Sequence, residues 1–367
     1  MPERRPKVLF VATLPPPVHG AAMMGKCIHD SSVVNGTFDA DWVNLSTSRS
    51  LSDVSRFGLA KAFSVLAVYG RVLLRLLGHR YDCCYVTATC YGRGFLKDAP
   101  AVLLCKLFCR NVVLHHHNKG MSLYSGRPFY RWLMRLVYRG TRVMLLSEKL
   151  YDDVSAIVSR EQVLTCPNGI DVPVSGQVRS DPAAPDFVFL SNLLASKGLI
   201  VLLDALSSLR AEGVACSCVI AGAESAEIDA DCLSGEISSR GLDGTVAYAG
   251  PVYGMSKERL LSSGSVLVLP TMNDCQPLVV LEAMAHSMPV LTTCQGAVSD
   301  MVDDGVNGLM TAQGDPEDLA EKMKWMLGHP EERKRMGMRG RALYEGEFTE
   351  DAFIRRFCEC IGKALER

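Results

Sequence analysis

Short apolar runs that alternate with helical patterns are the feature that most constrains this chain. A run of four to seven residues rich in Val, Ile, Leu and Phe is typical of a buried strand, and strands alternating with helices predict a parallel sheet wrapped by helices. The expected strands of the first half are residues 7–13, 42–45, 83–87, 112–115 and 143–146, and those of the second half are residues 187–190, 218–221, 246–248, 266–269 and 290–292. Between the halves, residues 173–186 are rich in Pro, Ser, Gly and Ala without apolar periodicity, which indicates a linker. We therefore predict an α/β protein with domains at residues 1–172 and 187–346.

Composition narrows the classes of function. A chain of 367 residues with 48% hydrophobic and 22% charged residues can bury a core in each of two domains, and its net charge of −1 argues against nucleic acid as a partner. The 14 cysteines lie partly in apolar runs such as Cys83-Cys84, so we expect reduced, buried thiols and a cytoplasmic protein. No run has the length of a membrane-spanning helix.

The segment from Ser265 to His286 has the layout of an anion site. An apolar run closed by Pro270 is followed by an irregular loop, and Pro277 is expected at the first position of a helix, which leaves the amides of Leu278 and Val279 free to bind a ligand. Asp274 precedes this helix start and Glu282 follows it, which places the two carboxylates roughly 8 Å or more apart. A diphosphate flanked by hydroxyl groups would fit between them. The alternative is that Asp274 is a helix N-cap and Glu282 a solvated helix residue.

Asp274-x7-Glu282, together with Pro289-Val290-Leu291-Thr292, resembles the signature of glycosyltransferase family four (group 1) on the GT-B fold. Further matches are Pro167-Asn168-Gly169-Ile170-Asp171 and Asp304-Gly305-Val306-Asn307-Gly308-Leu309. The resemblance implies two Rossmann-like parallel-sheet domains facing across a cleft, with a C-terminal helix at residues 347–367 packing back on the first domain. It also implies that Asp274, where the family usually has Glu, contacts the donor sugar and that Glu282 contacts its ribose.

The segment 189–198 resembles the family pattern in which an Arg and a Lys neutralise the donor diphosphate. Lys197-Gly198 fits this pattern, and Asn192 occupies the Arg position, where it offers a hydrogen bond without a charge. A lysine at a helix start is electrostatically unfavourable unless an anion is present, which favours a phosphate role for Lys197.

Residues after other expected strands complete the predicted donor site. Gly20 would let backbone approach a ligand, and the resemblance implies nucleotide contacts at Gly222, Gly250 and Val252.

Three histidines follow the strand at 112–115. Consecutive side chains of an extended chain alternate faces, so His115, His116 and His117 cannot easily converge on one metal, and we expect no metal site. The resemblance implies that a histidine here binds the donor sugar. We select His117 for this contact, with His115 as the alternative and a structural cluster as the remaining possibility.

Two helical patterns in the first half carry cations. Arg127, Arg131, Arg135 and Arg139 repeat every fourth residue, and residues 57–80 combine Lys and Arg with an apolar stripe. Such helices can lie on an anionic membrane surface, and the alternative is a solvated face above a core-facing stripe.

The resemblance implies a retaining, metal-independent glycosyltransferase without a cofactor. It would move a hexose from a nucleoside diphosphate-sugar to a saccharide or lipid-linked saccharide acceptor, in cell-surface polysaccharide or glycolipid assembly. If the basic helices contact a membrane, the protein would lie peripherally on the inner face of the cell membrane. Lys197 and the helix start at Leu278 would stabilise the leaving diphosphate. The alternatives are a nucleotide-sugar epimerase or hydrolase of the same fold and a non-catalytic partner subunit, the latter suggested by Asn192 and Asp274.

Overall fold

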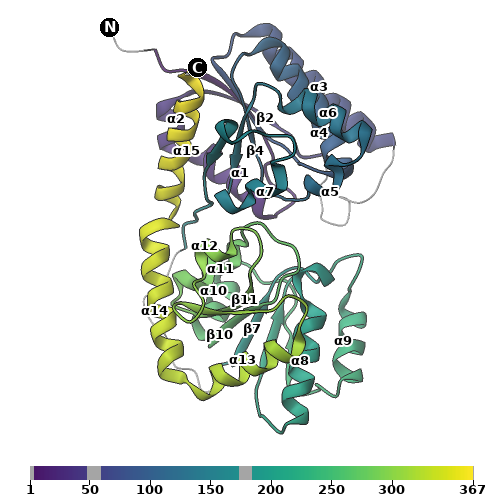
Figure 1. The fold of residues 1–367 in the computed structure, drawn as a ribbon, viewed down its shortest axis with the longest axis vertical. Helices are drawn as coiled ribbons and strands as arrows, with labels where there is room; N and C mark the ends of the chain where they lie inside the picture. The colour runs from purple at the N-terminus through teal and green to yellow at the C-terminus, as the bar shows by residue number, and fades with distance from the viewer. Residues whose placement is uncertain (1–3, 48–58, 173–183, 367) are drawn as a thin grey trace. The chain divides into compact units, whose positions relative to one another are not determined.

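The computed structural model describes residues 4–47, 59–172 and 184–366, and it divides into two compact units (Figure 1). The N-terminal unit comprises the chain up to Gly169 together with the residues from Glu350 onward, and the C-terminal unit comprises Ile170–Thr349. These boundaries lie three residues from those expected at 172 and 347. Most of the expected linker, residues 173–183, lies outside the described residues.

The N-terminal unit contains a six-stranded parallel sheet in the order β2-β1-β3-β4-β5-β6. The strands are β1 (Lys7–Ala12), β2 (Asp39–Asn44), β3 (Cys83–Thr87), β4 (Val112–His115), β5 (Arg142–Leu145) and β6 (Val163–Thr165). The helices are α1 (Gly20–Asp30), α2 (Ser32–Thr37), α3 (Leu59–Gly78), α4 (Gly92–Phe108), α5 (Ser122–Ser125), α6 (Pro128–Tyr138), α7 (Tyr151–Val154) and α15 (Glu350–Leu365), with 3-10 turns at Glu148–Leu150 and Arg160–Gln162. Every residue of β3 and β4 is buried, as expected for strands covered on both faces.

Helix α15 completes the core of the N-terminal unit although it ends the described chain. It contacts α2, β3 and β4, and Figure 1 shows it in yellow beside α2. The ring of Phe357 is fully buried, with its centroid 5.1 Å from that of Tyr85 and 6.3 Å from that of Phe10. The sheet therefore depends on side chains from both ends of the sequence.

The C-terminal unit contains a second six-stranded parallel sheet, in the order β12-β11-β10-β7-β8-β9. The strands are β7 (Phe187–Leu190), β8 (Cys218–Ala221), β9 (Val246–Tyr248), β10 (Val266–Leu269), β11 (Val290–Thr293) and β12 (Gly308–Thr311). The helices are α8 (Leu199–Ala211), α9 (Ala230–Ser239), α10 (Gly254–Ser263), α11 (Leu278–Ala285), α12 (Val298–Met301), α13 (Pro316–Gly328) and α14 (Pro330–Glu347), with a 3-10 turn at Ala195–Lys197.

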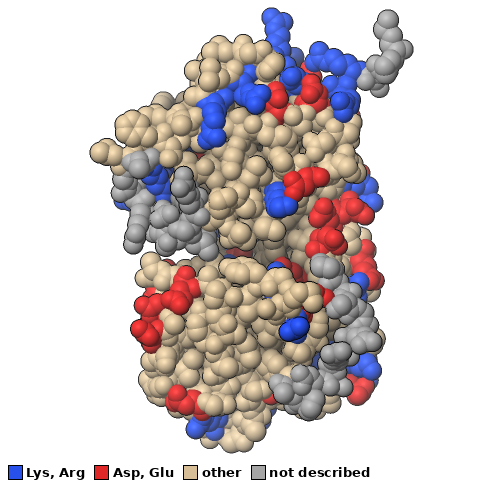
Figure 2. Space-filling model, turned by 180° about the vertical axis from the view of Figure 1, so that it is seen from behind, with Lys and Arg blue, Asp and Glu red and all other residues tan. Residues whose placement is uncertain are grey.

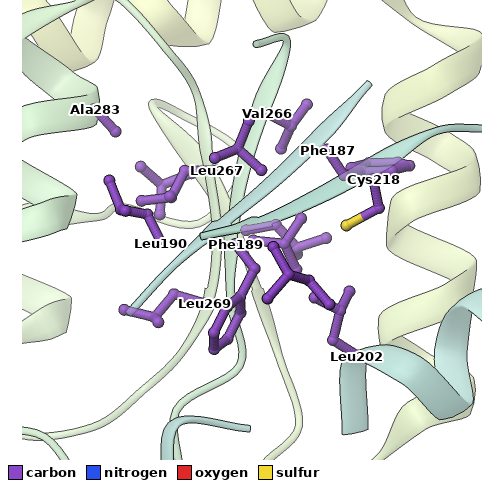
Figure 3. Close-up of a cluster of buried hydrophobic side chains, with 14 of the residues drawn as sticks. Phe187, Phe189, Leu190, Leu202, Cys218, Val266, Leu267, Leu269 and Ala283 are labelled. Atoms are coloured by element: carbon purple, nitrogen blue, oxygen red, sulfur yellow. The ribbon is translucent and has the colours of Figure 1, made fainter. Parts of the chain in front are cut away.

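Apolar side chains from the central strands form the core of this unit. Figure 3 shows Phe187 and Phe189 of β7, Leu267 of β10 and Leu202 of α8 in one cluster, all of them fully buried. The two sheets confirm the predicted fold class, an α/β protein with two parallel-sheet domains. The strand order of the C-terminal sheet reverses direction between β7 and β10, and in open α/β sheets ligands bind beyond the carboxyl ends of the strands at such a point.

Candidate functional site

The loops that follow β7 and β10 are locked together at the reversal point of the C-terminal sheet. Gly198 has φ +80°, and a Cβ on it would lie 1.9 Å from the carbonyl oxygen of Pro270. The carbonyl oxygen of Ser196 accepts hydrogen bonds from the amides of Met272 at 2.8 Å and Asn273 at 3.3 Å. Only glycine combines this backbone conformation with so close an approach, so Gly198 fixes the spacing of the two loops.

This arrangement brings two predicted site residues into contact. Lys197 Nζ donates a hydrogen bond to Asp274 Oδ2, and the two side chains are 23% and 15% exposed. Asp274 Oδ1 accepts from the amide of Cys275 at 3.0 Å, and Asp274 does not cap helix α11, because the N-cap residue is Pro277. The alternative interpretation of Asp274 as the N-cap is therefore wrong.

Helix α11 presents its first amides without partners, although it begins one residue later than expected. Pro277 has extended backbone (φ −68°, ψ 119°) and is the N-cap, so the prediction that it is the first helical residue is wrong. Its carbonyl oxygen already accepts from the amide of Val280 at 3.1 Å, which is compatible with an N-cap residue. Within the described part of the chain, the amides of Leu278 and Val279 donate to no acceptor. Two free amides and the positive end of the helix dipole can bind an anion.

Glu282 lies one turn further along α11 and is paired with a lysine that the sequence analysis missed. Lys257 Nζ on α10 donates to Glu282 Oε1 at 2.6 Å, with 33% and 18% of the two side chains exposed. No motif relates the two positions, and the ion pair connects α10 to α11 only in the folded chain. The sequence offered only one signal, a lysine in the first turn of a helix, where the helix dipole disfavours it.

The turns after β8 and β9 lie at the same edge of the sheet. A Cβ on Gly222 would lie 1.7 Å from the carbonyl oxygen of Ser191, so the backbone after β8 runs directly against the loop that holds Asn192. The amide of Gly222 donates to the carbonyl of Gly250 at 2.9 Å, and Gly250 has φ +70°. Val252 is partly buried against the core. The predicted nucleotide contacts after β8 and β9 therefore lie at the same edge of the C-terminal sheet.

The N-terminal unit has its own cluster of polar groups at the ends of its strands. Gly20 is the first residue of α1 and is exposed, and the N-cap residue His19 accepts a hydrogen bond from the amide of Ala22 through Nδ1 at 3.4 Å. Burial lowers the pKa of His19, which keeps its ring neutral and able to accept.

The three consecutive histidines differ in their contacts. The buried His115 and His116 rings hydrogen-bond to tyrosines, His115 Nδ1 to Tyr85 Oη at 2.7 Å and His116 Nε2 to Tyr138 Oη at 3.1 Å. His117 has buried ring nitrogens and interacts with Asn168, and burial lowers its pKa to about 3. Neutral His117, beside an asparagine of the Pro167–Asp171 motif, stays the predicted sugar contact. Among the described residues, no group of three or more His, Cys, Asp or Glu side chains could hold a metal ion.

The match to a known protein family lies within the C-terminal unit. Residues 175–343 match the family described as glycosyl transferases group 1. This part of the chain is a group 1 glycosyltransferase domain. One relative, the alpha-D-kanosaminyltransferase of Streptomyces kanamyceticus, is 26% identical over 168 residues, which is 46% of this chain and 43% of the relative. Another, the D-inositol 3-phosphate glycosyltransferase of an Arthrobacter species, is 31% identical over 163 residues, 44% of this chain and 38% of the relative.

Solved structures extend the likeness from the group 1 domain to both units. Sucrose-phosphate synthase from Thermosynechococcus elongatus has a TM-score of 0.78 at 15% identity, and the match covers 98% of this chain and 99% of the synthase chain. Anabaena Alr3699/HepE in complex with UDP has a TM-score of 0.73 at 17% identity, and the match covers 97% of this chain and 100% of the Anabaena chain. These likenesses show that the fold is GT-B. With the curated relatives, in contrast, the matched segment spans less than half of the relative's length, 43% and 38% in the two cases above.

Proposed function

We propose that this protein is a glycosyltransferase that moves a sugar from a nucleoside diphosphate-sugar to an acceptor hydroxyl. The observation that carries the proposal is the locked pair of loops beyond β7 and β10, which holds Lys197 and Asp274 beside the free amides of α11. Cationic and amide donors around a pocket for a diphosphate are what a departing nucleoside diphosphate requires, because they stabilise the negative charge that develops as the glycosidic bond breaks. The group 1 match over residues 175–343 supports the same assignment.

In the proposed mechanism the Lys197–Asp274 pair exchanges partners when donor binds. The diphosphate would attract Lys197 and bind the amides of Leu278 and Val279, and Asp274 would then accept hydrogen bonds from hydroxyls of the transferred hexose. Glu282 would accept from the ribose hydroxyls. His117, neutral at physiological pH because burial holds its pKa at about 3, would contact a sugar hydroxyl without acting as an acid.

We also propose that the reaction needs no metal ion, which the same charge argument favours, and that it proceeds with retention, as the family resemblance implies. Lysine and helix amides would supply the electrostatic stabilisation that a metal ion supplies in other phosphate chemistry. We expect transfer in the presence of EDTA at the rate seen without it, and an NMR spectrum of the first product that shows the anomeric configuration of the donor. A rate that depends on added Mg²⁺ or Mn²⁺ would contradict the metal-free mechanism.

Donor binding is tested by thermal stabilisation with UDP-, GDP- and ADP-sugars, because a ligand that binds the folded state raises the melting temperature by mass action. We expect one nucleotide to stabilise the protein and Lys197→Ala and Glu282→Ala to lose the effect. Lys324→Ala is the matched control, because this lysine pairs with Glu212 on the surface of the same unit. Isomerised or hydrolysed donor without acceptor would instead identify an epimerase or hydrolase, and no stabilisation by any nucleotide would favour a non-catalytic subunit.

We further propose that the acceptor is carried by a membrane, on the basis of an exposed surface of the N-terminal unit. This basic apolar patch consists of Leu107 and Phe108 at the end of α4 and Phe129, Arg131, Trp132, Arg135 and Leu136 of α6. Phe129, Trp132 and Leu107 are 59%, 62% and 76% exposed, so they share the solvent face with the arginines. That observation counts against the alternative in which the apolar residues face the core and only charges face water.

Two further observations join this patch into one surface. Lys106 Nζ donates to the carbonyls of Val137 at 3.0 Å and Arg139 at 2.8 Å, which ties the end of α4 to the end of α6. Helix α3, which packs on α4, exposes Phe63, Leu66 and Leu77 along one stripe. Figure 2 shows one face of the N-terminal unit, on whose upper part Lys and Arg side chains lie among some Asp and Glu side chains. No helix among the described residues is long and apolar enough to cross a bilayer.

Anionic lipid is the partner that this mixture of aromatic and basic groups fits, and a lipid-linked saccharide of cell-surface polysaccharide or glycolipid assembly is the proposed acceptor. Each arginine near an anionic surface contributes about 1 kcal/mol, so Arg131→Glu/Arg135→Glu should weaken binding to phosphatidylglycerol vesicles on the order of a hundredfold or more. The control Lys149→Glu/Arg160→Glu makes the same change in net charge elsewhere on the N-terminal unit. Equal loss in both variants would show a general charge effect and contradict the patch.

A further inference from the structure

The predicted donor site has no surplus of positive charge in its side chains. Among the described residues of the site, Lys197 pairs with Asp274 and Lys257 pairs with Glu282, so the four charges sum to zero. The position where group 1 sequences carry an arginine is Asn192, which brings no charge. A nucleoside diphosphate carries at least two negative charges, and the site therefore needs every cation that it contains.

Lys257 has the location and the surroundings of such a cation. It lies in the first turn of α10, which begins at Gly254, and the residue before the helix, Tyr253, provides no side-chain cap. A lysine at this end of a helix is opposed by the helix dipole, so its placement calls for a compensating anion. Glu282 Oε1 supplies one partner at 2.6 Å.

The pairing also leaves Glu282 ready for a second contact. No hydrogen bond to Glu282 Oε2 occurs within the described residues, so this oxygen can accept from hydroxyl groups. Glu282 lies four residues beyond Leu278, and at about 1.5 Å rise per residue the carboxylate stands about 6 Å along the helix from the free amides. That separation is comparable to the distance from a ribose to the phosphates of a nucleotide.

We propose that Lys257 is a nucleotide-positioning residue that holds Glu282 Oε2 toward the ribose hydroxyls and adds the positive charge that Asn192 lacks. This inference rests on the proposed function, since it assumes that a nucleoside diphosphate binds at this edge of the C-terminal sheet. It assigns a role to α10, which none of the sequence motifs includes. It also gives a reason why the chain tolerates an uncharged residue at position 192.

The test is the affinity of the purified protein for the nucleoside diphosphate, UDP, GDP or ADP, that stabilises the wild type. We expect Lys257→Met, which keeps the length of the side chain without its charge, to weaken binding about tenfold by calorimetry and to raise KM for the donor more than it lowers kcat. Lys257→Arg should bind within about threefold of the wild type. Lys324→Met is the control, because its pair with Glu212 is about half exposed on both sides and should not affect binding.

A second variant separates charge from folding. If Lys257 compensates for Asn192, then Asn192→Arg should restore most of the affinity that Lys257→Met loses. Melting temperatures without ligand show whether each variant is folded. Wild-type affinity in Lys257→Met, or no recovery in the double variant, would overturn the inference. A wild type that binds none of the three nucleotides would overturn the proposed function instead, so the two failures are distinguishable.

Discussion

The buried ring of His116 should make the N-terminal unit sensitive to mild acid. The ring is 2% exposed, and burial lowers its pKa to about 4, while the carboxylate of Asp153 acts weakly in the opposite direction. In the unfolded chain a histidine has a pKa of about 6.5, so the unfolded state binds the proton more readily. Stability from this residue is therefore present above about pH 6.5 and is lost as the pH falls toward 4.

The size of the effect follows from the two pKa values. Between pH 7.5 and pH 5.0, a group with pKa about 6.5 unfolded and about 4 folded lowers the free energy of unfolding by about 2 kcal/mol. His116→Gln should remove that dependence, because glutamine does not titrate and its amide can still bond to Tyr138 Oη, which lies 3.1 Å from His116 Nε2. We thus expect the pH-dependent loss to be about 2 kcal/mol smaller in the variant than in the wild type.

The assay is urea unfolding at both pH values, followed by tryptophan fluorescence in a Trp325→Phe background. The remaining tryptophans, Trp42 and Trp132, then report only on the N-terminal unit, which avoids treating two units as one transition. His79→Gln, a change at an exposed histidine of the same unit, should behave like the wild type. A pH-dependent loss in His116→Gln that equals the wild-type loss would refute the reasoning.

Three further substitutions follow from the packing. Gly198→Ala should destabilise the C-terminal unit by about 2–4 kcal/mol, because its Cβ would meet the Pro270 carbonyl oxygen at 1.9 Å. The control Gly213→Ala, at a residue with φ +76° and open space around it, should show only the cost of the backbone conformation. Urea unfolding of the two variants measures both losses. Phe357→Ala should cost the N-terminal unit about 3–5 kcal/mol, seen as a lower urea midpoint, because a fully buried ring leaves a cavity. Lys106→Met should cost about 1–3 kcal/mol by loosening the end of α6, and hydrogen exchange should rise at the Arg139 amide more than in β1.

The sequence predicted the architecture because parallel strands leave a local signal. Buried strands such as β7 and β10 are apolar at every position, and this pattern can be recognised without tertiary information. Strands β6 and β12 were not predicted. Strand β6 has three residues, all partly buried, and β12 begins with glycine, so neither is a continuous apolar run. Their place in the sheet is set by pairing with β5 and β11, which is a tertiary effect.

The candidate site was predictable to the extent that motifs encode it. Lys197, Asp274 and the amides of α11 were found from their motif and their place at a helix start, and the structure brings the first two together. Lys257 was missed because a contact between α10 and α11 leaves no trace in sequence spacing. The different hydrogen bonding of His115 and His117 likewise depends on Tyr85, which comes from a neighbouring strand.

The return of α15 to the N-terminal sheet sets an order of events during synthesis on the ribosome. The C-terminal unit is complete once Thr349 has emerged, but the N-terminal unit lacks the Phe357 ring until its last helix follows. Domains made in sequence generally fold from the N-terminus first. Here the half that is translated first must wait until the other half has been translated, and Tyr85 and Phe10 lack the Phe357 ring in the interval. A released chain that ends at residue 349 should therefore fold its second domain and leave the first one without the cover of α15.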